Sequence, residues 1–313
     1  MRQTFFYKNG YRLSYADYGD KNGYPILIQH GLIASIDDYH LFDRLIETGA
    51  RLICIARPGY GESSSYEMSS FAEWAEIVSV LVDELELFQF DILGMSSGAP
   101  YSYALGHGFP DKVRNIFIFS GIPALYDEIV LQHWPYEMAK DKDMAFMEDL
   151  AHELFFSHIQ IDDLQKNDIR DSMMNNGFGV AQDLRLRTMD WGFHLSDVKA
   201  PVFMRHSKVD DNVPFETAVR TAELLPNCKL ELLEKGPHFS EEALDDFIQS
   251  TMLHSSNAFV MTTFQQIALL LIAIWFTLIV IRFRRSTSDL GVRPCYSWAI
   301  HACFSISWQS YME

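Results

Sequence analysis

The sequence is poor in cysteine and in positive charge. Its 313 residues contain four Cys, and 25 Lys and Arg against 42 Asp and Glu, for a formal charge of −17. The four Cys are widely separated and show neither a disulfide framework nor the spacing of a zinc site. Because an acidic surface repels nucleic acid, DNA or RNA binding is disfavoured. We interpret the acidity as a solubilising surface and Cys54, in an apolar segment, as a small core residue.

The sequence also lacks the marks of export. Residues 1–8 contain no signal-peptide hydrophobic segment, and no N-x-S/T glycosylation site occurs. These absences predict a cytoplasmic location for the main part of the chain. With 48% hydrophobic and 21% charged residues, the chain can bury a sizeable core, which argues against global disorder. Its length suits one large α/β domain with insertions or two smaller domains.

Short apolar segments alternate with amphipathic ones, a pattern typical of repeated β-α units around a mostly parallel sheet. The expected strands are residues 4–7, 12–18, 25–29, 52–56, 90–93, 115–119, 201–204 and 229–233. The expected helices include residues 37–47, 69–87, 215–225 and 241–249, with another directly after residue 98. The first two strands flank Asn9 and Gly10, a hairpin signal.

This alternation stops between residues 122 and 198. The segment is helical in pattern and rich in Met, Trp, Phe and acidic residues. Open α/β sheets bind ligands beyond the carboxyl ends of their strands, where an insertion between two strands would lie. We therefore predict a core of residues 1–121 and 199–253 with a helical cap at residues 122–198. The alternative is an ordinary helical subdomain without a gating role.

Residues 94–98 read G-x-S-x-G between an expected strand and an expected helix. In that setting Ser96 occupies a sharp strand-to-helix turn that exposes its hydroxyl to a reacting carbonyl. The pattern alone is weak, because chance supplies it in roughly one chain of this length in ten. Ser96 could also serve only as a helix N-cap. The assignment therefore depends on the partners that serine catalysis requires.

Serine catalysis needs a base, an acid that orients the base, and donors for the developing oxyanion. His238 follows the last expected strand in a Gly-Pro turn and is the candidate base. Asp210 and Asp211 follow the preceding strand, and either could orient it. The backbone N–H groups of Ser97 and of Leu32, which follows an earlier strand, are the candidate oxyanion donors.

Together these residues resemble the α/β-hydrolase family. The motifs that carry the resemblance are His30-Gly31, R-P-G-Y-G-E-S at 57–63, G-x-S-x-G at 94–98, D-x-x-V-P at 210–214 and G-P-H at 236–238. They span about residues 3–252 in one consistent order, Ser then Asp then His. The resemblance implies an α/β-hydrolase fold, with a mostly parallel central sheet, helices on both faces and a helical cap insertion.

The resemblance also assigns roles. It implies a catalytic triad of Ser96, Asp210 (rather than Asp211) and His238, with the oxyanion hole formed by the amides of Leu32 and Ser97. It implies hydrolysis of a small-molecule carboxylic ester through an acyl-enzyme, without a cofactor. The same triad serves lactones, C–C bonds next to ketones, N-terminal proline amides and perhydrolysis. A non-catalytic ligand-binding protein on this scaffold is the remaining alternative.

Two positions depart from the family pattern. Ala56 stands where members often carry Asp, and Ser207 where they often carry Gly. Neither residue type takes part in the chemistry, so the departures concern the shape of the loops. Arg57 is expected at least to brace its own turn.

Three aromatic residues of the insertion, Trp134, Trp191 and Phe193, are candidates to line an acyl pocket, and ordinary packing is the alternative. No metal site is expected. His152 and Glu153 begin a zinc-like H-E pair, but the next histidine is His158, at i+6 instead of the i+4 that shares a helix face.

Residues 254–313 form an extension that contains a hydrophobic segment at about 259–281, followed by Arg-Phe-Arg-Arg. Its apolar centre, 267–281, is shorter than the roughly 20 residues of a spanning helix, but the preceding turns supply the difference. A membrane helix that anchors the protein is the leading interpretation, and a helix packed on the protein or on a partner is the alternative. The flanking arginines would place the acidic domain outside the cytoplasm, which conflicts with the missing signal peptide. An accidental extension of the reading frame is a third interpretation.

Overall fold

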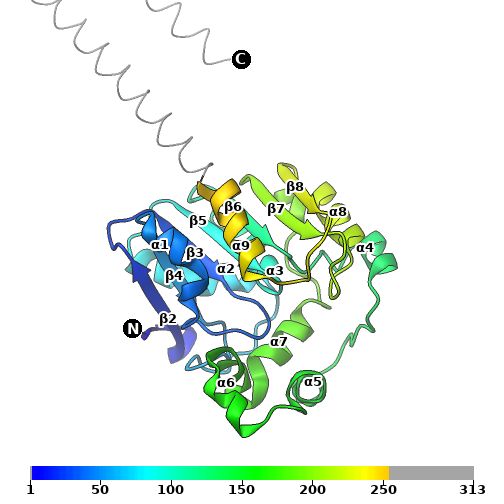
Figure 1. Ribbon diagram of the computed structural model, residues 1–313. Coiled ribbons are helices and arrows are strands. Elements are labelled where there is room, and N and C mark those ends of the chain that lie inside the picture. The colour runs from blue at the N-terminus through cyan, green and yellow to red at the C-terminus, as the bar shows by residue number, and fades with distance from the viewer. Residues whose placement is uncertain (1, 254–313) are drawn as a thin grey trace, which may run out of the picture. The chain divides into compact units, whose positions relative to one another are not determined.

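The computed structural model describes residues 2–253, which are built around an eight-stranded sheet. In chain order the strands are β1 (Arg2–Tyr7), β2 (Tyr11–Gly19), β3 (Pro25–Gln29), β4 (Arg51–Ile55), β5 (Phe90–Met95), β6 (Val113–Phe119), β7 (Val202–Ser207) and β8 (Cys228–Leu233). Across the sheet they follow the order β1-β2-β4-β3-β5-β6-β7-β8 (Figure 1). β2 is antiparallel to β1 and β4, and all other neighbours are parallel. The mostly parallel sheet confirms the predicted fold class.

Helices cover both faces of the sheet. On one face lie α2 (Ala72–Glu84), α3 (Gly98–Gly108) and α8 (Phe215–Leu224), and on the other α1 (Asp43–Glu47) and α9 (Glu241–Phe247). Each face has its own buried cluster, and successive residues of β3 alternate between them. Leu27 belongs to the first cluster, whereas Ile26 and Ile28 belong to the second. A strand buried on both faces has a continuous run of apolar residues, and this run predicts β3.

Two local expectations are refined by the structure. The helix expected at 37–47 is a 3-10 turn, Tyr39–Phe42, followed by the five-residue α1. The hairpin signal lies in a 3-10 turn, Lys8–Gly10, in which Asn9 has a φ of 57°. Asn tolerates this left-handed conformation better than most residues.

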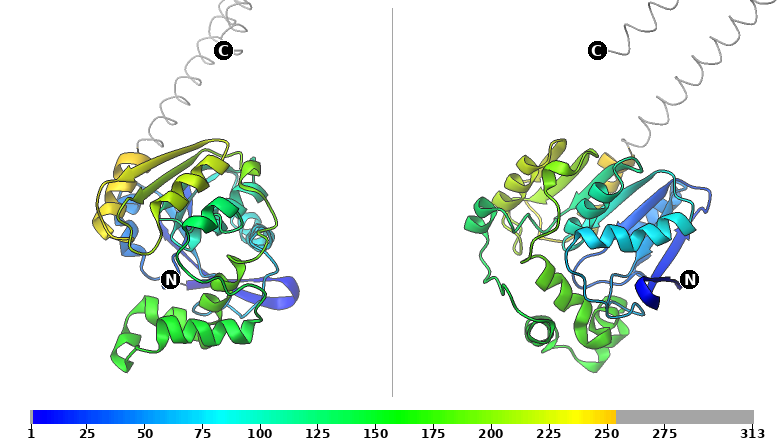
Figure 2. Two further views of the ribbon diagram at one scale, coloured as in Figure 1. Left: turned by 90° about the vertical axis from the view of Figure 1, so that its right-hand side faces the viewer. Right: turned by 180° about the vertical axis from the view of Figure 1, so that it is seen from behind.

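The segment between β6 and β7 is helical, as its pattern indicates. It contains α4 (Glu128–His133), α5 (Met144–Ala151), α6 (Asn167–Met173) and α7 (Phe178–Leu186). Asp127 and Asp143 begin α4 and α5 by accepting hydrogen bonds from free backbone N–H groups of the first turn. Figures 1 and 2 show α5, α6 and α7 gathered at one end of the sheet. Residues 2–253 pack as one compact unit, so the predicted boundary between core and cap stays a prediction.

The strand order creates a crevice between β3 and β5. The chain leaves β3 for β4 on one side and places β5 on the other, and ligands of open α/β sheets bind where the order reverses in this way. α3 begins directly against β3: a Cβ on Gly98 would lie 2.1 Å from the Gln29 carbonyl oxygen. Only glycine permits this close approach, which sets the position of the turn before α3.

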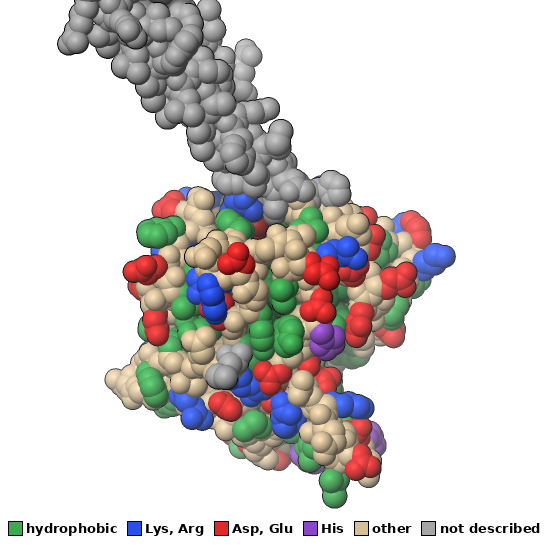
Figure 3. Space-filling model, turned by 60° about the vertical axis from the view of Figure 1, so that its left-hand side comes forward, with side chains coloured by type: hydrophobic (Ala, Val, Ile, Leu, Met, Phe, Trp, Pro, Cys, Tyr) green, Lys and Arg blue, Asp and Glu red, His purple; other side chains and the backbone are tan. Residues whose placement is uncertain are grey.

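Figure 3 shows one face of the molecule, where acidic and basic side chains are interspersed with hydrophobic ones instead of forming one basic surface. Within residues 2–253 there is no helix with the length and apolar character needed to cross a bilayer. The hydrophobic segment predicted at about 259–281 lies outside the described residues.

Candidate active site

Ser96 lies at the carboxyl end of β5, in the turn that leads into α3. Its φ is +47°, in the left-handed region that a non-glycine residue rarely adopts. Glycines make room for this turn on both sides, since a Cβ on Gly94 would lie 2.2 Å from the Ser102 hydroxyl oxygen. Ser96 does not cap α3, because the N-cap position belongs to Ser97. The strained turn presents the Ser96 hydroxyl beyond the edge of the sheet.

The structure brings Ser96, His238 and Asp210 into one hydrogen-bonded chain. The Ser96 Oγ is 2.9 Å from His238 Nε2, and His238 Nδ1 is 2.8 Å and 3.1 Å from the two carboxylate oxygens of Asp210. A carboxylate only accepts, so Nδ1 carries the ring proton of neutral His238 and Nε2 accepts from the serine hydroxyl. This is the geometry that nucleophile activation requires.

Asp210, not Asp211, contacts the imidazole. Asp210 also accepts the backbone N–H groups of Asn212 and Val213, at 2.9 Å and 2.8 Å. Burial raises the pKa of the Asp210 carboxyl, but hydrogen bonds from His206 and His238 outweigh it and hold that pKa well below its ordinary value. Asp210 is therefore ionised and in place to orient His238. Asp211 is exposed and accepts the backbone N–H of His238 at 3.2 Å.

His206 is a neighbour of Asp210 that sequence reasoning did not single out. It is buried at the end of β7, and its Nε2 lies 3.2 Å from Asp210 and 2.9 Å from the Val213 carbonyl oxygen. Its place four residues before Asp210 was the available signal.

Ser207 is one of the two positions that depart from the family pattern. Its hydroxyl donates a hydrogen bond to the Gly236 carbonyl oxygen at 2.7 Å. That bond ties the loop of Asp210 to the loop of His238.

The predicted oxyanion donors lie beside the serine. A Cβ on Gly31 would be 3.9 Å from the Ser96 Cβ, which brings the turn after β3 up to the serine. Leu32 and Ser97 both line the same cavity as Ser96. Within residues 2–253 neither backbone N–H donates to a protein acceptor, so both are free to bind a ligand oxygen.

Arg57 does more than brace its own turn. Its guanidinium donates to the carbonyl oxygens of His30 and Gly31, at 2.7 Å and 2.8 Å, and forms a buried ion pair with Asp183 of α7 at 2.5 Å. Burial lowers the pKa of Arg57, but the charge of Asp183 outweighs it and raises that pKa above its usual value. Arg57 is therefore permanently charged. It joins the loop beside Ser96 to the helical insertion.

His30 is held neutral in this network. Burial, and then the charge of Arg57, place its pKa well below the ordinary value. Its Nδ1 donates to the Gly31 carbonyl at 2.8 Å, and its Nε2 accepts the Arg57 backbone N–H at 3.4 Å. Tyr60 adds a hydrogen bond to the Leu32 carbonyl at 2.8 Å. The backbone of the predicted oxyanion loop is thus anchored at three successive residues.

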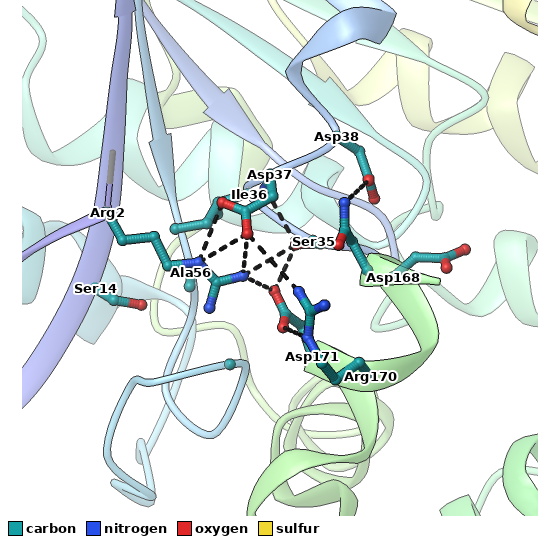
Figure 4. A network of polar contacts seen from close by, with 12 residues as sticks. Arg2, Ser14, Ser35, Ile36, Asp37, Asp38, Ala56, Asp168, Arg170 and Asp171 are labelled. Carbon is teal, nitrogen blue, oxygen red and sulfur yellow. Dashed lines mark hydrogen bonds and ion pairs between the residues drawn. The ribbon is translucent and has the colours of Figure 1, made fainter. Parts of the chain in front are cut away.

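A second polar network ties the same loop to α6 (Figure 4). Arg2 of β1 pairs with Asp37 at 2.7 Å and with Asp171 of α6, and Ser35 donates to Asp171. Because Ser35 and Asp37 follow the predicted oxyanion loop in the chain, α6 is fixed relative to that loop by the N-terminal strand. Ala56, the other position that departs from the family pattern, is buried and directly precedes Arg57 in the chain.

Ser96 and His238 open into a cavity of about 1140 Å³. Much of its wall is apolar and comes from the insertion, including Trp134, Met147 and Leu150. A cavity of this size and lining suits a small organic molecule. Among residues 2–253 no cluster of three or more His, Cys, Asp or Glu side chains could hold a metal ion.

Of the three aromatic residues proposed for an acyl pocket, only Trp134 lines this cavity. Trp191 is completely buried, and its ring packs 5.2 Å from Phe71 and 5.0 Å from Tyr126. Phe193 is also buried and stacks on His107. For these two residues the packing interpretation agrees with the structure. The chain between α7 and β7 passes along α2 and α3, where the Trp191 carbonyl accepts from the Ala72 backbone N–H and Phe193 lies against His107.

Comparison with known proteins gives consistent matches. A family model described as "alpha/beta hydrolase fold" matches residues 24–240. A 2-hydroxy-6-oxononadienedioate/2-hydroxy-6-oxononatrienedioate hydrolase of Pseudomonas putida is 24% identical, over 75% of this chain and 88% of its own. A non-heme chloroperoxidase of Streptomyces lividans is 24% identical, over 74% and 90%. The solved structure of an esterase from Exiguobacterium antarcticum superposes with a TM-score of 0.61 at 19% identity, over 83% and 99%.

The buried ion pair yields a stability prediction. Asp183→Asn removes the countercharge of Arg57 and should lower the free energy of unfolding by about 3–5 kcal/mol, because the buried guanidinium is left unpaired. Urea denaturation followed by circular dichroism measures the change. Glu223→Gln, which breaks the exposed pair with Arg220, is the matched control and should cost less than about 1 kcal/mol. Equal small losses in both variants would contradict the structural role of the buried pair.

Proposed function

The chain belongs to the α/β-hydrolase fold family, and on that premise we propose that it is a serine hydrolase of a small-molecule carboxylic ester. The observation that carries the proposal is the chain of hydrogen bonds from Ser96 through His238 to Asp210, with Ser96 and His238 in the wall of the cavity. Each residue lies on a loop that follows a different strand, β5, β8 and β7. Esterases and other hydrolases among the similar proteins support the reaction class.

In the proposed mechanism Ser96 Oγ attacks the carbonyl carbon while His238 Nε2 takes the hydroxyl proton. Asp210 holds the Nδ1 proton of the imidazole and stabilises the imidazolium that forms. The amides of Leu32 and Ser97 donate to the oxyanion, where one such donor contributes roughly 10²–10³ to the rate. His238 returns its proton to the leaving alcohol oxygen as the C–O bond breaks. It then deprotonates a water molecule that hydrolyses the acyl-enzyme and restores Ser96.

A second candidate is hydrolysis of a C–C bond next to a ketone. The observation in its favour is the match to hydrolases named for 2-hydroxy-6-oxo-dienedioates, over about three quarters of this chain. Such a substrate carries a ketone and carboxylates but no ester. The chemistry would use the same nucleophile or an activated water at the same place.

The nucleophile assignment predicts covalent labelling. A fluorophosphonate probe should label the wild-type protein, because it reacts with serine hydroxyls activated by a neighbouring base, and Ser96→Ala should abolish the label. Ser79→Ala removes a surface hydroxyl of α2 and is the control that should label normally. Absence of labelling in folded wild-type protein would instead favour a non-catalytic ligand-binding protein.

The acid assignment separates two adjacent carboxylates. Asp210→Asn should lower kcat by about 10³–10⁴, because the amide no longer fixes the tautomer of His238. Asp211→Asn should change kcat little, since its exposed side chain accepts only from the His238 backbone N–H and the Asn212 side-chain amide and does not contact the imidazole. Steady-state kinetics on the best ester of the panel below measures both. A larger loss in Asp211→Asn than in Asp210→Asn would overturn the assignment.

A substrate panel distinguishes the two reactions. We expect 4-nitrophenyl esters of graded acyl length to be hydrolysed, with release of nitrophenolate as the readout. A 2-hydroxy-6-oxo-dienedioate, followed by loss of its conjugated absorbance, tests the alternative. Turnover of the ketone without turnover of any ester would replace the ester hydrolase by the second candidate, and Ser96→Ala is the blank for both assays.

A further inference from the structure

Arg187 is a cation in the wall of the catalytic cavity. It stands at the C-terminal end of α7 and lines the same cavity as Ser96 and His238. Burial lowers the pKa of Arg187 to about 10, against weaker opposing effects of Asp183, Tyr60 and Tyr136. A guanidinium with this pKa is fully charged at neutral pH. The cavity wall therefore contains a permanent positive charge, and it includes Leu32 of the proposed oxyanion hole as well.

No protein group within residues 2–253 pairs with this charge. The Arg187 guanidinium makes neither an ion pair nor a side-chain hydrogen bond to the described residues. Arg185, two residues earlier on the same helix, shows the contrast. It pairs with Glu67 at 2.9 Å and lies outside the cavity wall.

Asp183, one helical turn before Arg187, is already saturated. One carboxylate oxygen accepts from Arg57 and Tyr101, at 3.3 Å and 2.6 Å, and the other from Arg57 and Tyr60, at 2.5 Å and 3.0 Å. These four donors occupy the acceptor sites that a carboxylate offers. Since Asp183 balances Arg57, the group formed by buried Arg57, buried Asp183 and half-buried Arg187 is left with one excess positive charge.

None of the other charged side chains of the cavity wall forms an ion pair with it. The half-buried carboxylates Asp38 and Asp168 accept from the Asn167 side chain, at 3.1 Å, and from the Ile169 backbone N–H, at 2.8 Å. Lys166 is exposed and pairs with Asp163. Glu137 and Glu241 are exposed. The Arg187 side chain is half-buried in the cavity wall, where a bound ligand can reach its guanidinium. A charged group with a shifted pKa in a cleft is a candidate ligand-binding group.

We infer that Arg187 binds a carboxylate of the substrate, so that the substrate class is a carboxylate-bearing acyl compound, such as the half-ester of a dicarboxylic acid. The planar guanidinium presents paired N–H donors that match a carboxylate in a bidentate arrangement. One excess positive charge suits a monoanionic carboxylate better than a dianionic phosphate. This inference rests on the proposed function and names its substrate.

Two esters of equal acyl length test it. In 4-nitrophenyl valerate the acyl chain ends in a methyl group, and in mono-4-nitrophenyl glutarate it ends in a carboxylate. The wild type should favour the glutarate ester in kcat/KM. Arg187→Met should lower kcat/KM for the glutarate ester by roughly 10- to 100-fold, the range of a hydrogen bond to a charged group, with little effect on the valerate ester. Arg187→Lys should recover part of the loss, and Arg185→Met is the matched control.

Stability separates binding from structure. Removing an unpaired cation should leave the Tm unchanged or raise it, so a lower Tm in Arg187→Met would indicate a structural role. Equal losses on both esters, or no preference for the glutarate ester in the wild type, would overturn the inference.

A binding measurement keeps the inference independent of turnover. Calorimetry should detect monomethyl glutarate binding to Ser96→Ala but not to the double variant Ser96→Ala/Arg187→Met. If the wild type hydrolyses neither ester while this difference is seen, the proposed ester hydrolysis fails and the carboxylate site stands. No binding to Ser96→Ala overturns the carboxylate site itself.

Discussion

The buried ion pair between Arg57 and Asp183 joins the two parts of the molecule that enclose the cavity. Both side chains are almost completely removed from solvent, with 1% and 3% of their surfaces exposed. Arg57 follows β4, and Asp183 lies on α7 of the helical insertion. The same guanidinium holds the carbonyl groups of His30 and Gly31. Because neither charge can be left unpaired in the interior, the insertion and the loop beside Ser96 take up one mutual arrangement.

That arrangement has an electrostatic consequence. Arg57 and two tyrosines occupy all the acceptor sites of the Asp183 carboxylate. Arg187, at the end of α7, therefore faces the cavity without an ion-pair partner among residues 2–253. Asp210 does not line the cavity; it is ionised and held by His206, His238 and backbone N–H groups. The cavity wall thus contains a guanidinium without an ion-pair partner among residues 2–253, which is the basis of the carboxylate site that we infer.

Some elements could be predicted from local pattern, and others could not. The strands were located to within a few residues, because apolar runs bounded by Gly and Pro mark buried parallel strands. Of the helix expected at 37–47, only Asp43–Glu47 is α-helical, and a 3-10 turn, Tyr39–Phe42, precedes it. The segment packs through Phe42 and Leu45, while Arg2 and Ser35 hold its start. The environment of Trp191 could not be predicted, because the sequence pattern of an aromatic residue in an insertion is the same whether its side chain faces a cavity or a core.

The sequence by itself determined the order of the elements and the identity of the chemically capable residues, because strand ends, glycine turns and motif spacing are local properties. Ser96 and His238 were identified in this way, with Asp210 or Asp211 left open until the family resemblance selected Asp210. Only the tertiary structure decided which polar groups share their partners. Two examples are Asp183, which is saturated by Arg57, and Arg187, which has no ion-pair partner among residues 2–253. They follow from contacts between segments more than a hundred residues apart or from the burial those contacts create. No local pattern encodes whether a charge is paired, since pairing depends on the distance between side chains that only the packed chain brings together.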